Sequence, residues 1–140
     1  MNALVNSQKQ AIQKLLGNLP ESEQIVKIAS YTGQETEDEK RKLQQSPPHI
    51  LLTNYVMLEL MLVRPWESIF VGPSLHFLVM DELHTYRGRQ GADVAMLIRR
   101  LRQRCGNPEL LCIGTSATMV TGSCPDDRRT AVAAFANCYG

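Results

Sequence analysis

Two adjacent acids end an apolar run in this sequence, because Asp81 and Glu82 directly follow HFLVM at 76–80. A buried ionised carboxylate needs a cation or hydrogen bonds to offset the cost of its desolvation. Two acids at the carboxyl end of a strand are suited to hold Mg²⁺ beside a nucleotide and to orient an attacking water. Asp81 is then the metal-side ligand, through water, and Glu82 is the base. The alternative is that both acids only cap the next segment.

A second polar group stands in a similar place, because TSAT at 115–118 comes at the end of the apolar run LLCIGT at 110–115. In open α/β sheets, ligands bind at the carboxyl ends of the strands. If both apolar runs are strands of a parallel sheet, both polar groups lie where such a sheet binds its ligands.

The elements that would position these groups alternate between strand and helix. Apolar runs predict strands at residues 2–5, 24–30, 49–53, 76–80 and 110–115. Most of these runs are continuously apolar instead of alternating, which is typical of a parallel sheet covered on both faces. The sequence therefore predicts an α/β fold.

Helix signals occur between the predicted strands. Asn6 and Ser7 are possible caps of a first helix, which Gly17 is placed to end. A second, solvated helix at 36–45 begins with a capping box of Thr36 and Glu39.

Two further helices carry apolar stripes at helical spacing, one before Pro65 and one over about 91–104. The stripe of the first consists of Val56, Met57, Leu60 and Met61. The stripe of the second consists of Val94, Leu97, Ile98 and Leu101. Both stripes are expected to face the core.

Length and composition are those of one soluble globular domain, with 140 residues of which 44% are hydrophobic and 21% are charged. The net charge of +1 gives no overall attraction to nucleic acid or membrane, so such binding needs a local patch. The longest apolar stretch, 55–63, is interrupted by Glu59 and is about half the ~20 residues of a membrane span. No secretion signal is recognisable, so no membrane association and a cytoplasmic location are expected.

The cysteines are expected to be structural thiols. No pair has the C-x-x-C spacing of a zinc site, and no His stands at ligand spacing. Nothing suggests an oxidising compartment in which disulfides would form. These cysteines are Cys105, Cys112, Cys124 and Cys138.

A local excess of positive charge follows the acid pair. It consists of Arg87, Arg89, Arg99, Arg100, Arg102 and Arg104. The arginines of the predicted helix are expected to be solvated. For Arg87 and Arg89, in the preceding loop, a solvated role and a phosphate-binding role stay open.

Five short motifs, in this order along the chain, resemble those of superfamily 2 helicases of the DEAD/DEAH type. They are NALVNSQ at 2–8 (motif Ia), YTGQ at 31–34 (motif Ic), TNYVML at 53–58 (motif Ib), DELH at 81–84 (motif II, the Walker B box) and SAT at 116–118 (motif III). The longer run from 81 to 102 is most similar to a narrower branch, the DNA helicases with a carboxyl-terminal cysteine-cluster domain of unknown function. Several of that branch are implicated in DNA repair. RNA helicases of the DEAH type are the alternative.

This resemblance implies a RecA-like three-layer sandwich with a mostly parallel sheet, of which residues 1–140 form a partial ATP-binding domain with motifs Ia to III. It implies ATP and Mg²⁺ as cofactors and nucleic acid, DNA before RNA, as a partner. Asp81 would contact Mg²⁺ through water and Glu82 would activate water. His84 would link motif II to motif III through the hydroxyls of Ser116 and Thr118.

Other positions of the motifs are candidates for contact with nucleic acid. Polar side chains and helix amino termini are good phosphate ligands, and a glycine in a turn allows a close approach of the strand. The candidate nucleic-acid-binding residues are Asn6, Gln8, Gly33, Thr53, Asn54, Arg87 and Arg89.

The phosphate-binding loop G-x-x-x-x-G-K-[ST] does not occur in the 140 residues. In the family this loop precedes motif Ia, and a second RecA-like domain follows motif III. The chain is therefore expected to be a segment of the first RecA-like domain that lacks the phosphate-loop strand, is inactive alone and has the remainder of the helicase core as its partner. The strand at 110–115 would then have an open apolar edge, which predicts that the chain alone self-associates.

Two functions of different classes remain. In the first, the sequence is part of an ATP-dependent helicase or translocase; in the second, the chain is a non-enzymatic remnant and at most a weak nucleic-acid or protein interaction module. A metal-dependent hydrolase built on Asp81 and Glu82 is a weaker third hypothesis. It lacks a further carboxylate or His at a neighbouring strand end that would complete a metal cage.

Overall fold

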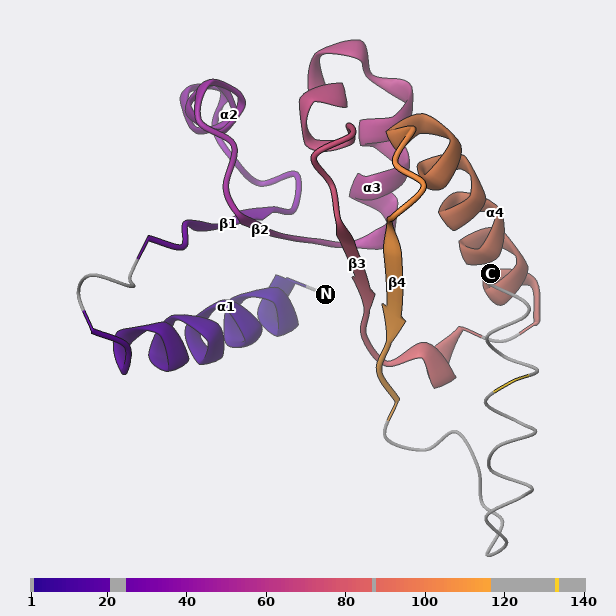
Figure 1. Ribbon diagram of the computed structural model, residues 1–140, viewed down its shortest axis with the longest axis horizontal. Helices are drawn as coiled ribbons and strands as arrows, with labels where there is room; N and C mark the ends of the chain where they lie inside the picture. Colours follow the sequence, from indigo (N-terminus) through magenta and orange to yellow (C-terminus); the bar gives the residue numbers. More distant parts are fainter. Residues whose placement is uncertain (1, 21–24, 87, 117–132, 134–140) are drawn as a thin grey trace, which may run out of the picture. The chain divides into compact units, whose positions relative to one another are not determined.

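The computed structural model describes residues 2–20, 25–86, 88–116 and 133 (Figure 1). The chain forms two compact units, Met1–Phe70 and Val71–Gly140. The membrane search, which covered these described residues, found no helix long and apolar enough to cross a bilayer.

The first unit combines helices with one pair of parallel strands. Its elements are α1 (Asn2–Gly17), β1 (Ile28–Tyr31), α2 (Glu37–Gln45), β2 (Ile50–Thr53), α3 (Tyr55–Val63) and a 3₁₀ helix (Pro65–Phe70). The register of the strands places Tyr31 beside Thr53, so β1 and β2 end together. α1 packs along both strands, and α3 packs on the 3₁₀ helix (Figure 1).

Polar caps fix where two of these helices begin. The Thr36 hydroxyl accepts the backbone N–H of Glu39, and the Glu39 carboxylate accepts the N–H of Thr36, which confirms the predicted capping box of α2. Asn54 caps α3, because its Oδ1 accepts the N–H of Met57 at 2.9 Å.

A buried polar contact ties the end of β1 to the 3₁₀ helix. Tyr31 and Glu67 are 0% and 1% exposed, and the Tyr31 hydroxyl donates to Glu67 Oε1 at 2.8 Å. Arg64 Nη1 lies 3.1 Å from the same oxygen, and the Tyr31 ring packs at a tilt on Phe70. Burial, together with the hydrogen bond to the Glu67 carboxylate and its charge, raises the pKa of Tyr31 above its ordinary range.

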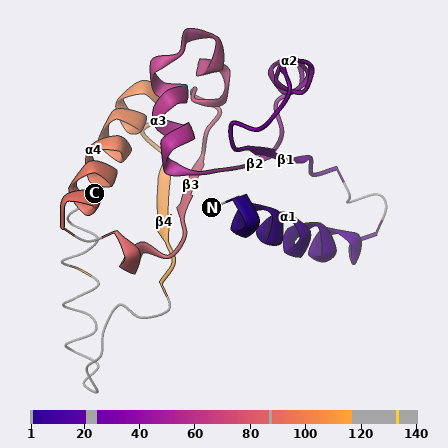
Figure 2. The ribbon, with the colours of Figure 1, turned by 180° about the vertical axis from the view of Figure 1, so that it is seen from behind.

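The second unit places one helix against a second pair of parallel strands. Its elements are β3 (Phe77–Met80), a 3₁₀ helix (Leu83–Thr85), α4 (Gly88–Cys105) and β4 (Leu111–Gly114). Phe77 lies beside Leu111 and Met80 beside Gly114, so these strands also end together. α4 runs alongside β3 and β4 in both views (Figure 1 and Figure 2).

The core of the second unit forms between α4 and one face of these strands. Its buried members are Met80, Leu83, Val94 and Ile98, with Leu78, Tyr86 and Cys112 packed against them. Gly114 belongs to this packing because a Cβ there would overlap the Cδ1 atom of Leu83. The α4 stripe predicted from spacing is confirmed, since Val94, Leu97, Ile98 and Leu101 are all buried.

The α/β class with parallel strands is confirmed, but the prediction of a strand at 2–5 is wrong. These residues form the first turns of α1, and the predicted caps Asn6 and Ser7 lie inside that helix. Val5, Ile12 and Leu16 share one helical face, and the first of them is only 5% exposed. Burial of Val5 on this face favours helix over strand for residues 2–5, so α1 begins at Asn2.

One strand boundary and one buried helix face also differ from the sequence prediction. β1 begins at Ile28, so Ile25 and Val26 lie before it and are 71% and 37% exposed. In α3, Leu58 is buried, whereas Val56 of the predicted stripe is 43% exposed. α3 is apolar on nearly all sides, so residue spacing alone does not identify its buried face.

Apolar side chains cover the face of β3 and β4 that points away from α4. Phe77, Val79 and Leu111 are each 58% exposed, and Ile113 is 44% exposed. Within the described part of the second unit, α4 packs on the opposite face of this pair, and cover on both faces stays a prediction for the complete sheet. A continuously apolar strand indicates a preference for burial, but the contacts of each face depend on the rest of the fold.

The described cysteines are free thiols. Cys105 is buried and Cys112 is partly buried. Burial, followed by the neighbouring Cys112, raises the pKa of the Cys105 thiol. Cys124 and Cys138 lie outside the described residues.

Candidate functional site

The acid pair lies where β3 and β4 end together. Beyond the last paired residues, the N–H of Thr115 donates to the carbonyl of Met80 at 2.9 Å, and the N–H of Leu83 donates to the carbonyl of Thr115 at 2.9 Å. Thr115 therefore holds the segment after β3 to the segment after β4. The parallel register of the strands is the reason that two sequence segments more than thirty residues apart meet at one edge.

Hydrogen bonds orient the Asp81 carboxylate at this edge. Its Oδ1 accepts the hydroxyl of Thr115 and the backbone N–H of Glu82, the latter at 3.0 Å. The residue itself is exposed. The structure thus presents to solvent one carboxylate whose direction is fixed by the neighbouring strand.

Glu82 adopts a strained backbone conformation. Its φ of 53° and ψ of 44° lie in the left-handed region, and it is the one residue other than glycine with positive φ in the described part of the chain. Such a conformation costs of order 1–3 kcal/mol and persists only where its surroundings impose it. Here the carbonyl of Glu82 accepts both the N–H and the hydroxyl of Thr85, which closes the 3₁₀ turn.

The Glu82 side chain has one oxygen turned away from water. Oε2 is shielded from solvent and lies 3.1 Å from Nδ1 of His84. This is an ion-pair distance without hydrogen-bond geometry, so Oε2 accepts no hydrogen bond within the described residues.

His84 also connects the two strand ends. Its Nδ1 lies 3.2 Å from the hydroxyl oxygen of Ser116, in the segment after β4. The structure therefore brings Asp81, Glu82, His84 and Ser116 together, as members of one cluster around Thr115. Thr118, the other expected partner of His84, lies outside the described residues.

This cluster fits Mg²⁺ that arrives with a nucleotide. In nucleotide sites Mg²⁺ is held by one or two carboxylates, with phosphate oxygens and water as its other ligands. Asp81 supplies one oriented carboxylate of that kind. Nowhere in the described ranges do three or more His, Cys, Asp or Glu side chains come close enough to hold a metal ion by themselves.

A second group of candidate residues meets where β1 and β2 end. The Thr53 hydroxyl donates to the carbonyl of Tyr31 at 2.7 Å, so its one proton is already used. Asn54 uses its carbonyl oxygen to cap α3, which leaves its NH₂ group as a donor. Gly33 follows in the turn after β1, with φ of 90°, and a Cβ there would lie 3.0 Å from Sδ of Met57.

The remaining candidates are on helices. Asn6 and Gln8 lie on α1, where Asn6 is exposed and Gln8 partly buried. Arg89 is exposed in the first turn of α4, and Arg87 lies outside the described residues.

Two residues of these sites were not singled out in the sequence. Thr115 enters the sequence prediction only as the first residue of TSAT, although a hydroxyl at the end of a strand neighbouring that of an acid is a usable signal. Glu35 binds the turn at Gly33 through both of its carboxylate oxygens. No pattern of residue types indicated this contact.

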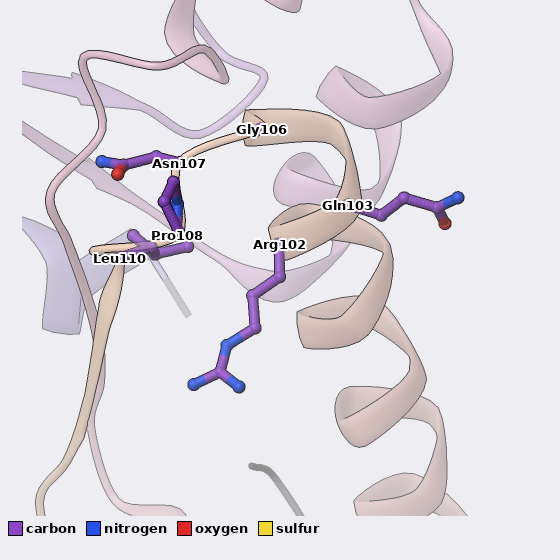
Figure 3. A pocket seen from close by; sticks show the side chains of 6 residues that line it. All are labelled: Arg102, Gln103, Gly106, Asn107, Pro108 and Leu110. Atoms are coloured by element: carbon purple, nitrogen blue, oxygen red, sulfur yellow. The ribbon is translucent and has the colours of Figure 1, made fainter.

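A pocket of the second unit lies away from the acid cluster. It has a volume of about 470 Å³ and is lined by Arg102, Gln103, Gly106, Asn107, Pro108 and Leu110 (Figure 3). These residues form the end of α4 and the turn that leads into β4, at the opposite end of the strand from Thr115. The Asn107 amide donates to the carbonyl of Leu75 and accepts the N–H of Glu109, so it serves the turn itself.

Comparison with known proteins identifies the family. Residues 1–123 match the sequence profile of DEAD/DEAH box helicases. The chain belongs to this family. The resemblance read from its motifs is thereby confirmed, and the acid cluster at the ends of β3 and β4 is part of a DEAD/DEAH box helicase.

Individual relatives support the same assignment. The chain is 41% identical over 104 residues to the Druantia protein DruE of Escherichia coli, covering 66% of this chain and 6% of DruE. It is 33% identical over 124 residues to the uncharacterized ATP-dependent helicase YprA of Bacillus subtilis, covering 84% of this chain and 16% of YprA.

A solved structure has a similar fold. The DUF1998 helicase MrfA bound to DNA and AMPPNP matches with a TM-score of 0.70 and 30% identity, over 86% of this chain and 17% of that one. This agrees with the narrower branch of DNA helicases indicated by the sequence. The chain thus spans 17% or less of the length of DruE, YprA and MrfA.

Proposed function

We propose that residues 1–140 are part of the ATP-binding domain of an ATP-dependent nucleic-acid helicase or translocase and carry its motifs Ia to III. The observation that supports this most strongly is the joined end of β3 and β4. There the Thr115 hydroxyl orients Asp81, and His84 lies 3.2 Å from the Ser116 hydroxyl. A metal-side acid, a proton acceptor and a link to the next strand are thus combined in one cluster.

Asp81 and Glu82 act on the nucleotide in this proposal. Asp81 holds the Mg²⁺ of the bound nucleotide through water, with its carboxylate kept in position by Thr115 and the Glu82 N–H. When bound, Mg²⁺ neutralises the charge that develops on the transferred phosphoryl group. Glu82 accepts a proton from the attacking water through its carboxylate, and its side chain is 46% exposed.

His84 and Ser116 transmit the nucleotide state in this proposal. His84 Nδ1 lies 3.1 Å from Glu82 Oε2 and 3.2 Å from Ser116 Oγ, so a change at either neighbour alters its contacts. Thr118 is the second hydroxyl proposed to contact His84. Coupling between the nucleotide site and the segment after β4 needs a part of the protein that can adopt two arrangements. The candidate is the His84 ring, which can favour its contact with Glu82 or its contact with Ser116.

The other motif residues bind the nucleic-acid strand. We assign this role to Asn6, Gln8, Gly33, Thr53, Asn54, Arg87 and Arg89. DNA is the proposed substrate because MrfA, 30% identical, is a helicase seen bound to DNA. In this group Asn54 offers its NH₂ group to a phosphate, and Thr53 contributes by fixing the end of β1, because its hydroxyl donates to the carbonyl of Tyr31.

Strand separation by the complete protein that contains this chain tests the proposal. A tailed duplex of DNA, or of RNA in a parallel reaction, is incubated with ATP and Mg²⁺. We expect separation of the DNA strands that requires ATP and is lost in Asp81→Asn, while this variant still binds single-stranded DNA. If neither duplex is separated and the protein does not translocate on single strands, the proposal is wrong.

A further inference from the structure

The turn after β1 binds a carboxylate through consecutive backbone donors. The N–H of Thr32 donates to Glu35 Oε1 at 2.7 Å, and the N–H of Gly33 donates to Glu35 Oε2 at 2.8 Å. The Thr32 hydroxyl adds a third donor at 3.0 Å to Oε1. Successive N–H groups that converge in this way, with a left-handed residue such as Gly33 at φ of 90°, form a concave site for anions.

The turn favours the charged form of its occupant. Burial raises the pKa of Glu35, but the N–H groups of Thr32, Glu35 itself and Gly33, with the Thr32 hydroxyl, outweigh burial and lower it. The hydrogen-bond partners that Thr32 and Gly33 offer to Glu35 are all donors, which suits an anionic pair of oxygens. A phosphate group carries the same pair of oxygens as a carboxylate.

Glu35 can leave the turn without unfolding a helix. It precedes Thr36, the cap of α2, and takes no part in the capping box that Thr36 forms with Glu39. The hydrogen bonds that Glu35 makes to Thr32 and Gly33 are within four residues, so its displacement breaks local hydrogen bonds.

The turn also stands at the proposed nucleic-acid edge of the first unit. Thr53 donates to the carbonyl of Tyr31, the residue directly before Thr32. Asn54 follows Thr53, with its NH₂ group free of the cap it makes to Met57. A phosphate in the Thr32–Gly33 turn would thus have Asn54 on the neighbouring strand end.

We propose that Glu35 is an internal anion that occupies a phosphate-binding turn formed by Thr32 and Gly33, and that a phosphate of a bound single strand displaces it. This inference rests on the proposed function, because it names one phosphate site of the same nucleic-acid surface. Glu35 then lowers the affinity for the strand, since binding must first expel it. If Glu35 instead only fixes the shape of the turn, its removal weakens binding.

The first test compares single-stranded DNA binding by the complete protein and its Glu35→Gln variant, followed by fluorescence anisotropy. The control is Asp38→Asn, which removes the same charge from an exposed position in the first turn of α2. Glu35→Gln should bind about tenfold more tightly, the effect of losing one competing charge-assisted contact, whereas Asp38→Asn stays within about twofold. Unchanged or weaker binding by Glu35→Gln overturns the inference.

The second test does not depend on nucleic acid and uses inorganic phosphate as the probe. Hydrogen exchange of a peptide that contains Thr32 and Gly33 is measured by mass spectrometry. In Glu35→Gln the exchange should be about tenfold faster than in the unmodified protein, and phosphate should slow it again when compared with chloride at equal ionic strength. If phosphate gives no protection, the anion site is refuted. Protection by phosphate in a protein that binds no strand supports the anion site and refutes the proposed function.

Discussion

Gly114 lies where the fold leaves no room for a side chain. A Cβ at this position overlaps Leu83 Cδ1 and lies 3.1 Å from Leu83 Cγ, and Leu83 is buried in the core of the second unit. We expect Gly114→Ala to lower the free energy of unfolding by about 1–3 kcal/mol, the usual cost of overpacking. Gly72→Ala is the control, because nothing lies within 4 Å of its Cβ, and it should change stability by less than about 0.5 kcal/mol. Equal effects of the two substitutions in denaturant unfolding would contradict this packing.

Tyr31 makes the stability of the first unit depend on alkaline pH. Its pKa in the folded state is raised, first by burial and then by the hydrogen bond to Glu67 and its charge. The stabilisation from this phenol is therefore complete below about pH 10, the ordinary pKa of tyrosine, and is lost as the pH rises above it.

The Tyr31→Phe variant isolates this effect. At neutral pH it should be less stable by about 1–3 kcal/mol, because Glu67 loses a buried hydrogen-bond donor. The difference in unfolding free energy between the two proteins should be constant below about pH 10 and should shrink as the pH rises above it. A difference that also stays constant above that pH in urea titrations argues against the assignment.

At the level of elements, α2 owes its beginning to a local motif. It has no buried residue, so the capping box of Thr36 and Glu39 is its main support. Thr36→Ala should destabilise the helix by about 1 kcal/mol and speed amide exchange in its first turn. Gln45→Ala, at the exposed far end of α2, is the control and should leave that exchange unchanged. Exchange that is equally slow in both variants would show that tertiary contacts hold the helix.

The sequence predicted those elements whose pattern is local. The capping box fixed α2, and the regular stripe from Val94 to Leu101 fixed α4, although α4 starts earlier, at Gly88. The first turn of α4 has no apolar residue, so periodicity could not detect it. The prediction of a strand at residues 2–5 is wrong because a mostly apolar run of four residues is too short to show a period, so it fits a strand as well as a helix.

The candidate site was predictable only in part, for a physical reason. That Asp81 and Glu82 lie at a strand end follows from the apolar run before them. The hydrogen bond from Thr115 to Asp81 depends on the register of β3 and β4, which the sequence does not state. Two other features arise from the surrounding fold and have no sequence signature. They are the left-handed conformation of Glu82 and the hydrogen bond from the Gly33 N–H to the Glu35 carboxylate.

For the whole molecule, the exposed face of β3 and β4 is the feature that governs solution behaviour. Phe77, Val79 and Leu111 present apolar side chains there although the chain is nearly neutral, with a net charge of +1. Exposed apolar surface on a short sheet promotes association, and little net charge opposes it. We expect the 140-residue chain, expressed alone, to self-associate.

A pair of matched substitutions tests this expectation by size-exclusion chromatography with light scattering. Val79→Lys places a charge on the exposed face and should shift the chain toward the monomer. Val63→Lys makes the same change at an exposed position of the first unit, 65% exposed, and should not. A monomeric unmodified chain would refute the expectation.

The central claim is that Glu82 is the base of an ATP-hydrolysing helicase site. Its most direct test is the rate of ATP hydrolysis by the complete protein in saturating single-stranded DNA, beside Glu82→Gln and the control Glu109→Gln. Glu109 is exposed in the turn before β4, far along the strand from the acid cluster. We predict that Glu82→Gln lowers kcat by about 100-fold or more while the protein still binds ATP, and that Glu109→Gln leaves kcat unchanged. Hydrolysis by Glu82→Gln at close to the unmodified rate would contradict the account.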